Sequence, residues 1–476
     1  MTSLLVRLQL TTWRRDPRLL GLLTAMALLL TLASSWATAD DVARRTAQQQ
    51  AATSARAEWL ERGADHPHRR AHYGDFVFRP AGSLARLDRG VQAQLGKVLR
   101  IEAHRQGTPL FSDASQAGTV ARFARPDAAF LLQLVVPLLL IFLGATGLAA
   151  DRDAGRLKLA LIQGASARTV ARGHFLALWG LGLSLLALVV AASLGTSTAL
   201  DGFTTLAWER LAGFMLVHAL FLAIVSAAVV AAALWARSAR SALLVLLAIW
   251  VVATAVLPRA MGSTANTLYP LPSQDAFQAA MQASREAGPD GHNPEDEAIE
   301  QRKQEVLDEY GVTSVKDLPI DFGGIAMQMD EDFGNEVWDT HHGELQAQFE
   351  RQGELMTLAA LVNPFQAIDH ISMAITGTDL AHDLDFQAQA ERYRRGLVHA
   401  LNHEHAYGGP KERGASWEAT PDFFAGLDAF EYAPPRWGAA IQHRTKELWS
   451  LVVWTFLALL AIRRGAARLE RSQRPC

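Results

Sequence analysis

Six apolar stretches constrain the fold of this 476-residue chain more than any other feature of its sequence. A helix needs about 20 mostly apolar residues to cross the roughly 30 Å hydrocarbon core of a bilayer, because each residue rises about 1.5 Å. The six stretches meet or approach this length, and they comprise residues 19–39, 128–150, 175–199, 211–236, 242–257 and 446–462. The sequence therefore predicts an α-helical polytopic membrane protein with six transmembrane helices, of which the last two are short.

Basic residues near the ends of these stretches predict the orientation of the chain, since Lys and Arg are retained on the cytoplasmic side. The N-terminal residues 1–18, the loop 151–174 and the tail 463–476 are rich in Arg, whereas residues 200–210 hold a single basic residue at their edge. We therefore expect both termini and the loop 151–174 to be cytoplasmic. The first stretch ends in Ala-Thr-Ala, which also fits a cleavable secretory signal, but its length favours an uncleaved helix.

Two long polar segments then fall outside the cytoplasm, residues 40–127 and residues 258–445. In the first region we expect a helical continuation of the first span up to Gly63 and Pro67, then strand-like residues; residues 91–107 fit either a strand or a helix. The second domain is predicted to be mainly helical, with candidate helices at 275–287, 295–310, 324–360, 364–376, 385–405 and from 437 into the last span. The only cysteine is Cys476, which excludes an intrachain disulfide.

The loop after the second stretch reads DRDAGRLKLALIQGASARTVARGHF, from Asp151 to Phe175. Asp151 and Asp153 would stand at the start of a short surface helix, where negative charge is favoured, and Gly164 would end it before a turn-rich piece at 165–172. Three apolar residues of this helix can share one flank, namely Leu157, Leu161 and Ile162. From spacing alone, an ordinary basic re-entry loop is the alternative.

The same stretch resembles the segment that follows the second span in ABC-2 type transporter permeases, where an acidic residue, a Gly, a leucine pair, a Ser and a later Gly recur at this spacing. Two further stretches resemble the subfamily of these permeases that carries the DUF3526 domain: HYGDFVFRPAGSLARLDRG with KVLRIEAHRQG, and NPFQAIDHISMAITGTDLAHDLDFQAQAERYRRGLVHALN. The resemblance implies an ABC-2 permease fold with two extracytoplasmic, mainly helical insertions. It also implies a bacterial inner-membrane location.

In that family the loop is a coupling helix that docks into a cleft of an ATP-binding subunit. The resemblance assigns coupling to Asp151, Asp153, Gly155, Arg156, Leu157, Leu161, Gly164, Ser166 and Gly173. It implies two partners, an ATP-binding subunit and a second permease that is identical or similar. ATP and Mg would be bound by the ATP-binding subunit, so we expect no cofactor and no catalysis in this chain, and no nucleic-acid partner.

Four positions depart from the pattern of the family. Asp151 and Asp153 stand where the family usually has Glu, Arg156 where it usually has Thr, and His174 where a Lys usually follows the Gly.

The large polar segments favour export, or transmission of movement to the outer compartment. The nearest approach to a phosphate-binding loop, residues 90–98, has one residue too many between its glycines and Val98 in place of Ser or Thr.

Histidines raise the question of a metal site, because all of the 15 except His174 and His218 lie in the two polar segments. His399 and His403 are four residues apart and would share a helix face, an arrangement that offers two ligands to Zn or Cu. No HExxH or Cys/His pattern accompanies them, so we expect surface or structural histidines and no metal.

Ionisable groups inside a membrane are costly and often functional, which makes His218 and Gln133 candidates for an intramembrane polar contact. A neutral His218 that is hydrogen-bonded between helices is the simpler interpretation. Asp379, His382 and Asp383 can be assembled into an acid/base group, but GTDLAH is more typical of a capped helix start. Two other functions stay open, a multi-span sensor or scaffold without an ATPase and a membrane metalloenzyme.

Overall fold

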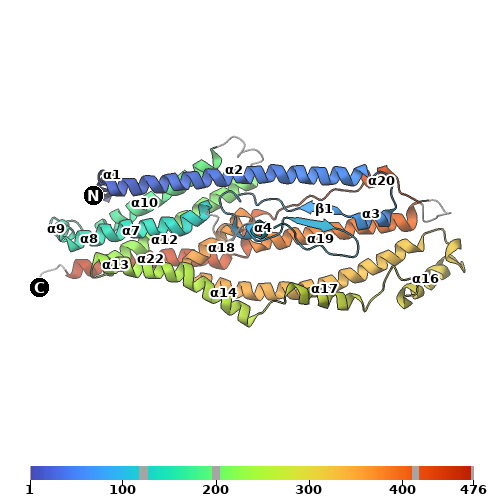
Figure 1. Ribbon diagram of the computed structural model, residues 1–476. Coiled ribbons are helices and arrows are strands. Elements are labelled where there is room, and N and C mark those ends of the chain that lie inside the picture. The colour runs from blue at the N-terminus through green and yellow to red at the C-terminus, as the bar shows by residue number, and fades with distance from the viewer. Residues whose placement is uncertain (1, 117–126, 196–203, 410–416, 473–476) are drawn as a thin grey trace.

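The protein is described by a computed structural model that covers residues 2–116, 127–195, 204–409 and 417–472. The molecule is elongated and mostly helical, and α2 (Pro17–Glu61) runs along most of its length (Figure 1). Both termini lie at one end, beside α1 (Thr2–Arg15), and α3 (Pro67–Tyr73) lies toward the other end (Figure 1).

Six helices are long and apolar enough to cross a membrane. Two of them are composite. The six are α2; α6 (Ala128–Phe130), η2 (Leu131–Val135), α7 (Val136–Gly144), η3 (Ala145–Ala149) and α8 (Ala150–Asp153) in one run; α10 (Ala167–Leu194); α12 (Thr205–Trp235); α13 (Ala239–Val251), η4 (Val252–Val256) and α14 (Leu257–Leu268) in one run; and α22 (Thr445–Ser472). Each predicted stretch overlaps one of these helices, which is consistent with a multi-pass membrane protein.

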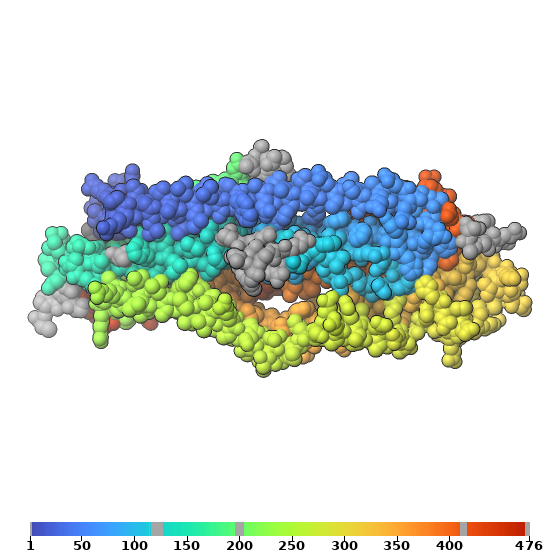
Figure 2. All heavy atoms as spheres, viewed as in Figure 1, coloured from blue at the N-terminus to red at the C-terminus, as the bar shows by residue number. Residues whose placement is uncertain are grey.

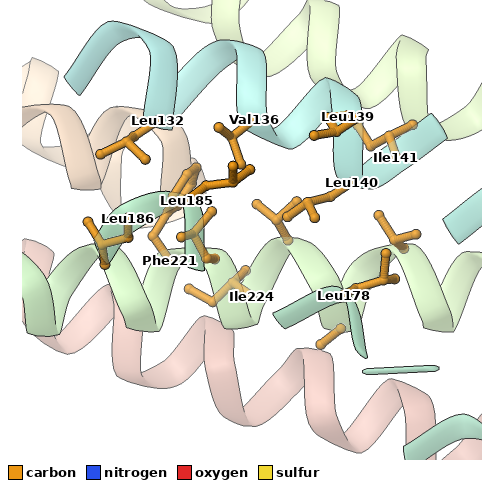
Figure 3. Close-up of a cluster of buried hydrophobic side chains, with 14 of the residues drawn as sticks. Leu132, Val136, Leu139, Leu140, Ile141, Leu178, Leu185, Leu186, Phe221 and Ile224 are labelled. Atoms are coloured by element: carbon orange, nitrogen blue, oxygen red, sulfur yellow. The ribbon is translucent and has the colours of Figure 1, made fainter. Parts of the chain in front are cut away.

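The long helices pack around one apolar core. Leu132, Val136 and Leu140 of the second run point toward Phe221 and Ile224 of α12 (Figure 3). The outward faces are apolar as well. Leu28, Leu244 and Phe456 are among the large apolar side chains that stay exposed on α2, α13 and α22. Such faces suit a lipid environment, because a soluble protein rarely leaves apolar patches of this extent in water.

The helix that contains the fifth predicted span extends beyond it and passes through a proline. The sequence placed the end at Leu257, before Pro258, yet the helix continues to Leu268. Proline lacks an N–H and its ring collides with the carbonyl of the preceding turn. Here the π-helical segment η4 directly precedes this position and widens the turn, so the helix passes through. The segment η2 precedes Pro137 in the same way.

The third and sixth spanning helices also differ from the predicted bounds. α10 begins at Ala167, eight residues before the predicted 175, because the Ser166 side chain accepts a hydrogen bond from Thr169 N at 3.1 Å and caps the helix. Residues 165–172 are therefore the cap and first two turns of α10 rather than a turn-rich piece. The predicted end of this span, 196–199, lies outside the described residues. α22 runs to Ser472, through most of the segment predicted as a tail.

The polar half of the molecule holds a small sheet and a set of helices. β1 (Asp75–Phe78) pairs antiparallel with β2 (Val98–Ile101), with Asp75 opposite Ile101, so the undecided residues 91–107 contain a strand. The remaining elements are η1 (Gly90–Ala93), α4 (Asp113–Gln116), α15 (Gln274–Arg285), α16 (Glu297–Tyr310), η5 (Val315–Asp317), α17 (Phe322–Val362), α18 (Pro364–Thr376), α19 (Leu380–His403), η6 (Glu404–Gly408), α20 (Pro421–Ala425) and α21 (Trp437–Gln442). The second polar segment is mainly helical, as predicted.

α2 and α18 are among the helices that connect the polar half to the apolar half. α2 carries Trp59, which is 1% exposed, into a core formed with Phe386 and Leu397 of α19 and Val77 of β1. α18 packs into the core of the long helices through buried isoleucines such as Ile371. Between the arm that α14 and α15 form and the part around α2, the molecule is hollowed (Figure 2).

Candidate functional site

The loop predicted for coupling lies at the end of the molecule that carries both termini (Figure 1). α8 ends at Asp153, and Gly155 then turns the chain with a left-handed backbone, φ +76°. A seven-residue helix follows, α9 (Arg156–Ile162), and Gly164 at φ +92° leads out of it. The structure thus has a short helix here. Asp151 and Asp153 do not start it, however, because they belong to the end of the preceding spanning helix.

The apolar residues of α9 face two ways, not along one flank as predicted. Leu157 is 5% exposed and packs into the core of the long helices, and Leu161 is half-buried against it. Ile162 is 71% exposed, and so is much of Leu159, at 56%. Leu157 therefore anchors α9, while Leu159 and Ile162 offer an apolar surface. Leu159 was not among the residues assigned to coupling. It lies two residues after Leu157 and therefore on another side of the helix.

Polar contacts fasten α9 to the neighbouring long helices. The Asp153 carboxylate accepts a hydrogen bond from Ala239 N, at the start of α13, at 2.8 Å. Arg152 donates to Ala233 O, near the end of α12, at 2.8 Å. Arg156 donates to Asp151 at 2.7 Å and so joins α9 to α8. The end of α8 is thus bonded to α12 and α13, and α9 is joined to them through α8.

The two remaining residues assigned to coupling serve helix packing. Ser166 caps α10, as described above. Gly173 lies against α1, where an added Cβ would be 2.7 Å from Leu5 Cβ. By contrast, nothing lies within 4 Å of a Cβ added to Gly155 or Gly164. The nine residues therefore do not form one surface: Gly155, Arg156 and Gly164 are exposed beside α9, whereas Leu157 and Gly173 are inside.

The two polar candidates inside the spanning helices lie within hydrogen-bond distance of each other. Gln133 Nε2 lies 3.2 Å from His218 Nε2, and His218 Nδ1 lies 2.9 Å from Phe214 O. A carbonyl oxygen only accepts, so Nδ1 carries the proton and Nε2 accepts from the Gln133 amide. Both side chains are buried. The neutral, hydrogen-bonded histidine of the simpler interpretation therefore fits this geometry.

The histidines gather at a place that the sequence analysis did not select. His399 and His403 lie on α19 with ring centroids 6.4 Å apart, and His403 lies against Tyr407. Among the described residues, one group of metal-binding side chains converges, and it contains neither of them. Its members are His68, His72, His104 and His292, with one ring nitrogen of each within 4.8 Å of all the others.

The environment of this group keeps its buried member neutral. Burial lowers the pKa of His68 from 6.5 to about 2, and the neighbouring His72, His104 and His292 act in the same direction. His68 and His72 are four residues apart on α3, a spacing visible in the sequence as HRRAH. His104 and His292 are far away along the chain, and no local pattern marks them.

Comparison with known families adds one match. Residues 276–433 match the model of a domain of unknown function, DUF3526. The chain carries a DUF3526 domain. The match includes the stretch NPFQAIDHISMAITGTDLAH and its continuation, but not the quoted residues of the first polar segment or the α8–α9 loop. No curated protein and no solved structure matches the chain.

The DUF3526 domain meets the spanning helices at Arg210, near the start of α12. Its guanidinium is 1% exposed and donates to Ile375 O at 3.0 Å and to Pro435 O at 2.9 Å. It also lies 3.4 Å from His382 Nε2. Ile375 is near the end of α18 and His382 is in the first turn of α19, so these contacts join α12 to both helices. From the sequence, Arg210 was only the single basic residue at the edge of the loop 200–210.

The acid/base residues that could be assembled from sequence turn out to be structural at this junction. Asp379 caps α19 by accepting from His382 N, and its carboxylate lies 2.6 Å from His382 Nδ1 and 2.9 Å from His443 Nε2. Burial by itself raises the pKa of Asp379, but the hydrogen bonds from His382 and His443 outweigh it and hold the pKa well below 3.8. Asp383 pairs instead with Arg79, at 2.8 Å.

Proposed function

We propose that this chain is the membrane-spanning permease subunit of an ATP-driven ABC-2 type transporter, energised by a separate ATP-binding subunit. The observation that carries the proposal is α9: a short helix between the second and third long helices, anchored by Leu157 and presenting Leu159 and Ile162. The DUF3526 domain at residues 276–433 supports the same assignment, because it was expected from the resemblance to this family, and the six long apolar helices are compatible with it.

In this proposal the end with both termini and α9 faces the bacterial cytoplasm, and the polar half faces outward. ATP and Mg are bound by the partner. ATP binding then moves the partner subunits, and the difference in their affinity for the two states drives the change in this chain. A second permease, identical or similar, completes the assembly. We propose export, or transmission of movement to the outer compartment, as the outcome.

The contacts of α12 supply a route for that movement. One end of α12 bonds to Arg152 beside α9, and the other end bonds through Arg210 to the DUF3526 domain. An α-helix of 31 residues is about 46 Å long at 1.5 Å per residue and transmits axial displacement well. The proposed lever therefore reaches from the docking helix to the outer domain within a single element.

The test is a pair of exposed apolar residues against a matched control. We expect Leu159→Asp with Ile162→Asp to abolish co-purification of the ATP-binding subunit and its stimulated ATPase activity, because two charges would be buried in the interface. Val315→Asp, at an exposed apolar position in the polar half, should change neither. Unchanged co-purification of the double variant would contradict the docking assignment. If no ATP-binding subunit co-purifies with the wild-type chain, the result favours the sensor or scaffold function.

A further inference from the structure

Four histidine side chains from three separate segments meet in the polar half of the molecule. His68 and His72 come from α3, His104 follows β2, and His292 lies in the loop between α15 and α16. His68 Nε2 lies 3.0 Å from His72 Nε2, and His104 Nε2 lies 3.2 Å from His292 Nε2. All four ligand atoms lie within 4.8 Å of one another.

These distances match the size of a metal shell. Zinc binds imidazole nitrogen at about 2.0–2.1 Å, which puts the nitrogens of a tetrahedral four-ligand site roughly 3.3 Å apart. Without an ion, four ring nitrogens that point at one another can form two hydrogen-bonded pairs at most, and any protonation would set like charges in contact. An ion would give all four nitrogens a common partner.

The surroundings of His104 resemble the outer support of a metal ligand. His104 Nδ1 lies 2.7 Å from Asp330 Oδ2, and the backbone N–H of His104 donates to Glu331. Metal-binding imidazoles usually have a carboxylate or carbonyl at the nitrogen that does not bind the ion, which fixes the ring and its tautomer. The backbone of His104 is left-handed, φ +61°, an uncommon conformation for a non-glycine residue. The two carboxylates hold this turn in place.

The loop of His292 is likewise held close to α17. A Cβ added to Gly291 would lie 2.7 Å from Ala326 O, so only glycine permits this approach. Asp290 accepts a hydrogen bond from His292 N at 3.0 Å. The backbone at His292 is therefore held in place by packing within the DUF3526 domain.

We propose that His68, His72, His104 and His292 bind one divalent transition-metal ion, Zn²⁺ being the ion whose four-coordinate nitrogen shell they match. The ion joins the first polar segment to the DUF3526 domain, because three ligands come from before residue 105 and one from residue 292. Asp330 and Glu331 lie directly behind His104, where they also pair with Arg285 and Arg394. This assignment is independent of the permease proposal.

The experiment uses the full-length chain in detergent, stripped with a chelator and titrated with Zn²⁺, and with Co²⁺ as a spectroscopic probe. We expect one ion per chain by elemental analysis and the visible absorption of tetrahedral Co²⁺. His68→Ala with His72→Ala should abolish both. The matched control is His399→Ala with His403→Ala, which removes two histidines at the same spacing on another helix and should leave binding unchanged.

His292→Ala provides the test that does not depend on the folding of α3, because His292 is exposed and lies in a loop. We expect it to weaken Zn²⁺ binding and to remove the increase in thermal unfolding temperature that Zn²⁺ gives the wild-type chain. Asp330→Asn should weaken binding roughly tenfold to a hundredfold. Wild-type chain without stoichiometric Zn²⁺ binding overturns the proposal. So does equal binding by the His292→Ala variant, since that would reduce the site to an adventitious pair on α3.

Discussion

Asp379 shows how one carboxylate can hold several elements together. It caps α19, and it accepts from His382 and from His443, which lies just before α22. His382 in turn lies against Arg210 of α12. Since Arg210 only donates, His382 Nε2 accepts from it and Nδ1–H donates to Asp379. A neutral histidine thus links a cation to an anion, and this chain of contacts has no need of a catalytic function.

We predict that Asp379→Asn lowers the stability of the protein by about 1–3 kcal/mol at pH 7, because a buried charge-assisted network loses its anion. Asparagine still caps the helix, so the effect isolates the charge. The folded-state pKa of Asp379 lies below its ordinary 3.8. Its stabilisation is therefore present above about pH 3.8 and is lost as the pH falls through the folded pKa. Thermal unfolding followed from about pH 5 down to about pH 2 should show a smaller loss of stability on acidification in the variant than in the wild type; an equal loss would contradict this account.

The Gln133–His218 pair is a second case in which geometry fixes a proton. His218 must donate from Nδ1 to Phe214 O and accept at Nε2 from Gln133. Gln133→Leu leaves Nε2 without its donor, and His218→Phe leaves the amide without its acceptor. Each loss is greater in an apolar environment than in water.

For this pair we predict single variants that are destabilised and a double variant, Gln133→Leu with His218→Phe, that recovers part of the loss. Interhelical hydrogen bonds in membranes average about 0.6 kcal/mol and reach about 1.7 kcal/mol, so the coupling energy should fall in that range. Unfolding of the four proteins in detergent measures it. Strictly additive losses would mean that the two side chains do not interact.

Two glycines of α10 differ in whether a neighbouring helix packs against them. Gly173 and Gly180 both lie on α10, seven residues apart and so on nearly the same face. An added Cβ at Gly173 would meet Leu5 of α1 at 2.7 Å, whereas nothing lies within 4 Å at Gly180. Gly173 is therefore needed for the close approach of α1, a role in packing that a motif-based assignment to coupling does not express.

We predict that Gly173→Val costs about 1–3 kcal/mol through overpacking and loosens α1. Gly180→Val, the control on the same helix, should be tolerated. Limited proteolysis near Arg14 and Arg15, at the end of α1, reports the loosening directly. If both variants are cut at the wild-type rate, α1 does not depend on Gly173.

Elements were predictable from the sequence to the extent that local pattern determines them. The apolar stretches became long helices, and Gly63 ends α2 at the expected place with φ +66°. The fifth apolar stretch ends at Leu257, but its helix continues past Pro258 to Leu268, directly after the π-helical segment η4. The residues of the candidate sites were less predictable than the helices. Leu159 was missed on a helix whose buried side is set by tertiary contacts, and His104 and His292 meet only through the fold.

At the scale of the whole molecule, the two halves are joined by few elements that span the junction. α2 continues from the apolar core to Trp59, and Arg210, near the start of α12, bonds to the DUF3526 domain. α9 and both termini lie at one end, whereas α16 and the four-histidine cluster belong to the polar half (Figure 1). A membrane around the long helices would therefore place α9 and the histidines on opposite sides.

This arrangement predicts a labelling pattern, after the native Cys476 is replaced by Ser. A cysteine at Gln163, exposed beside α9, should react with a membrane-impermeant maleimide only after the cells are lysed. A cysteine at Thr313, exposed between α16 and η5, should react in intact spheroplasts. We expect this pattern because Arg is in excess at the α9 end, and basic residues near spans favour the cytoplasmic side. The reverse pattern would place α9 outside, where no ATP-binding subunit can reach it. Labelling of both positions from one side would mean that the long helices do not span the membrane.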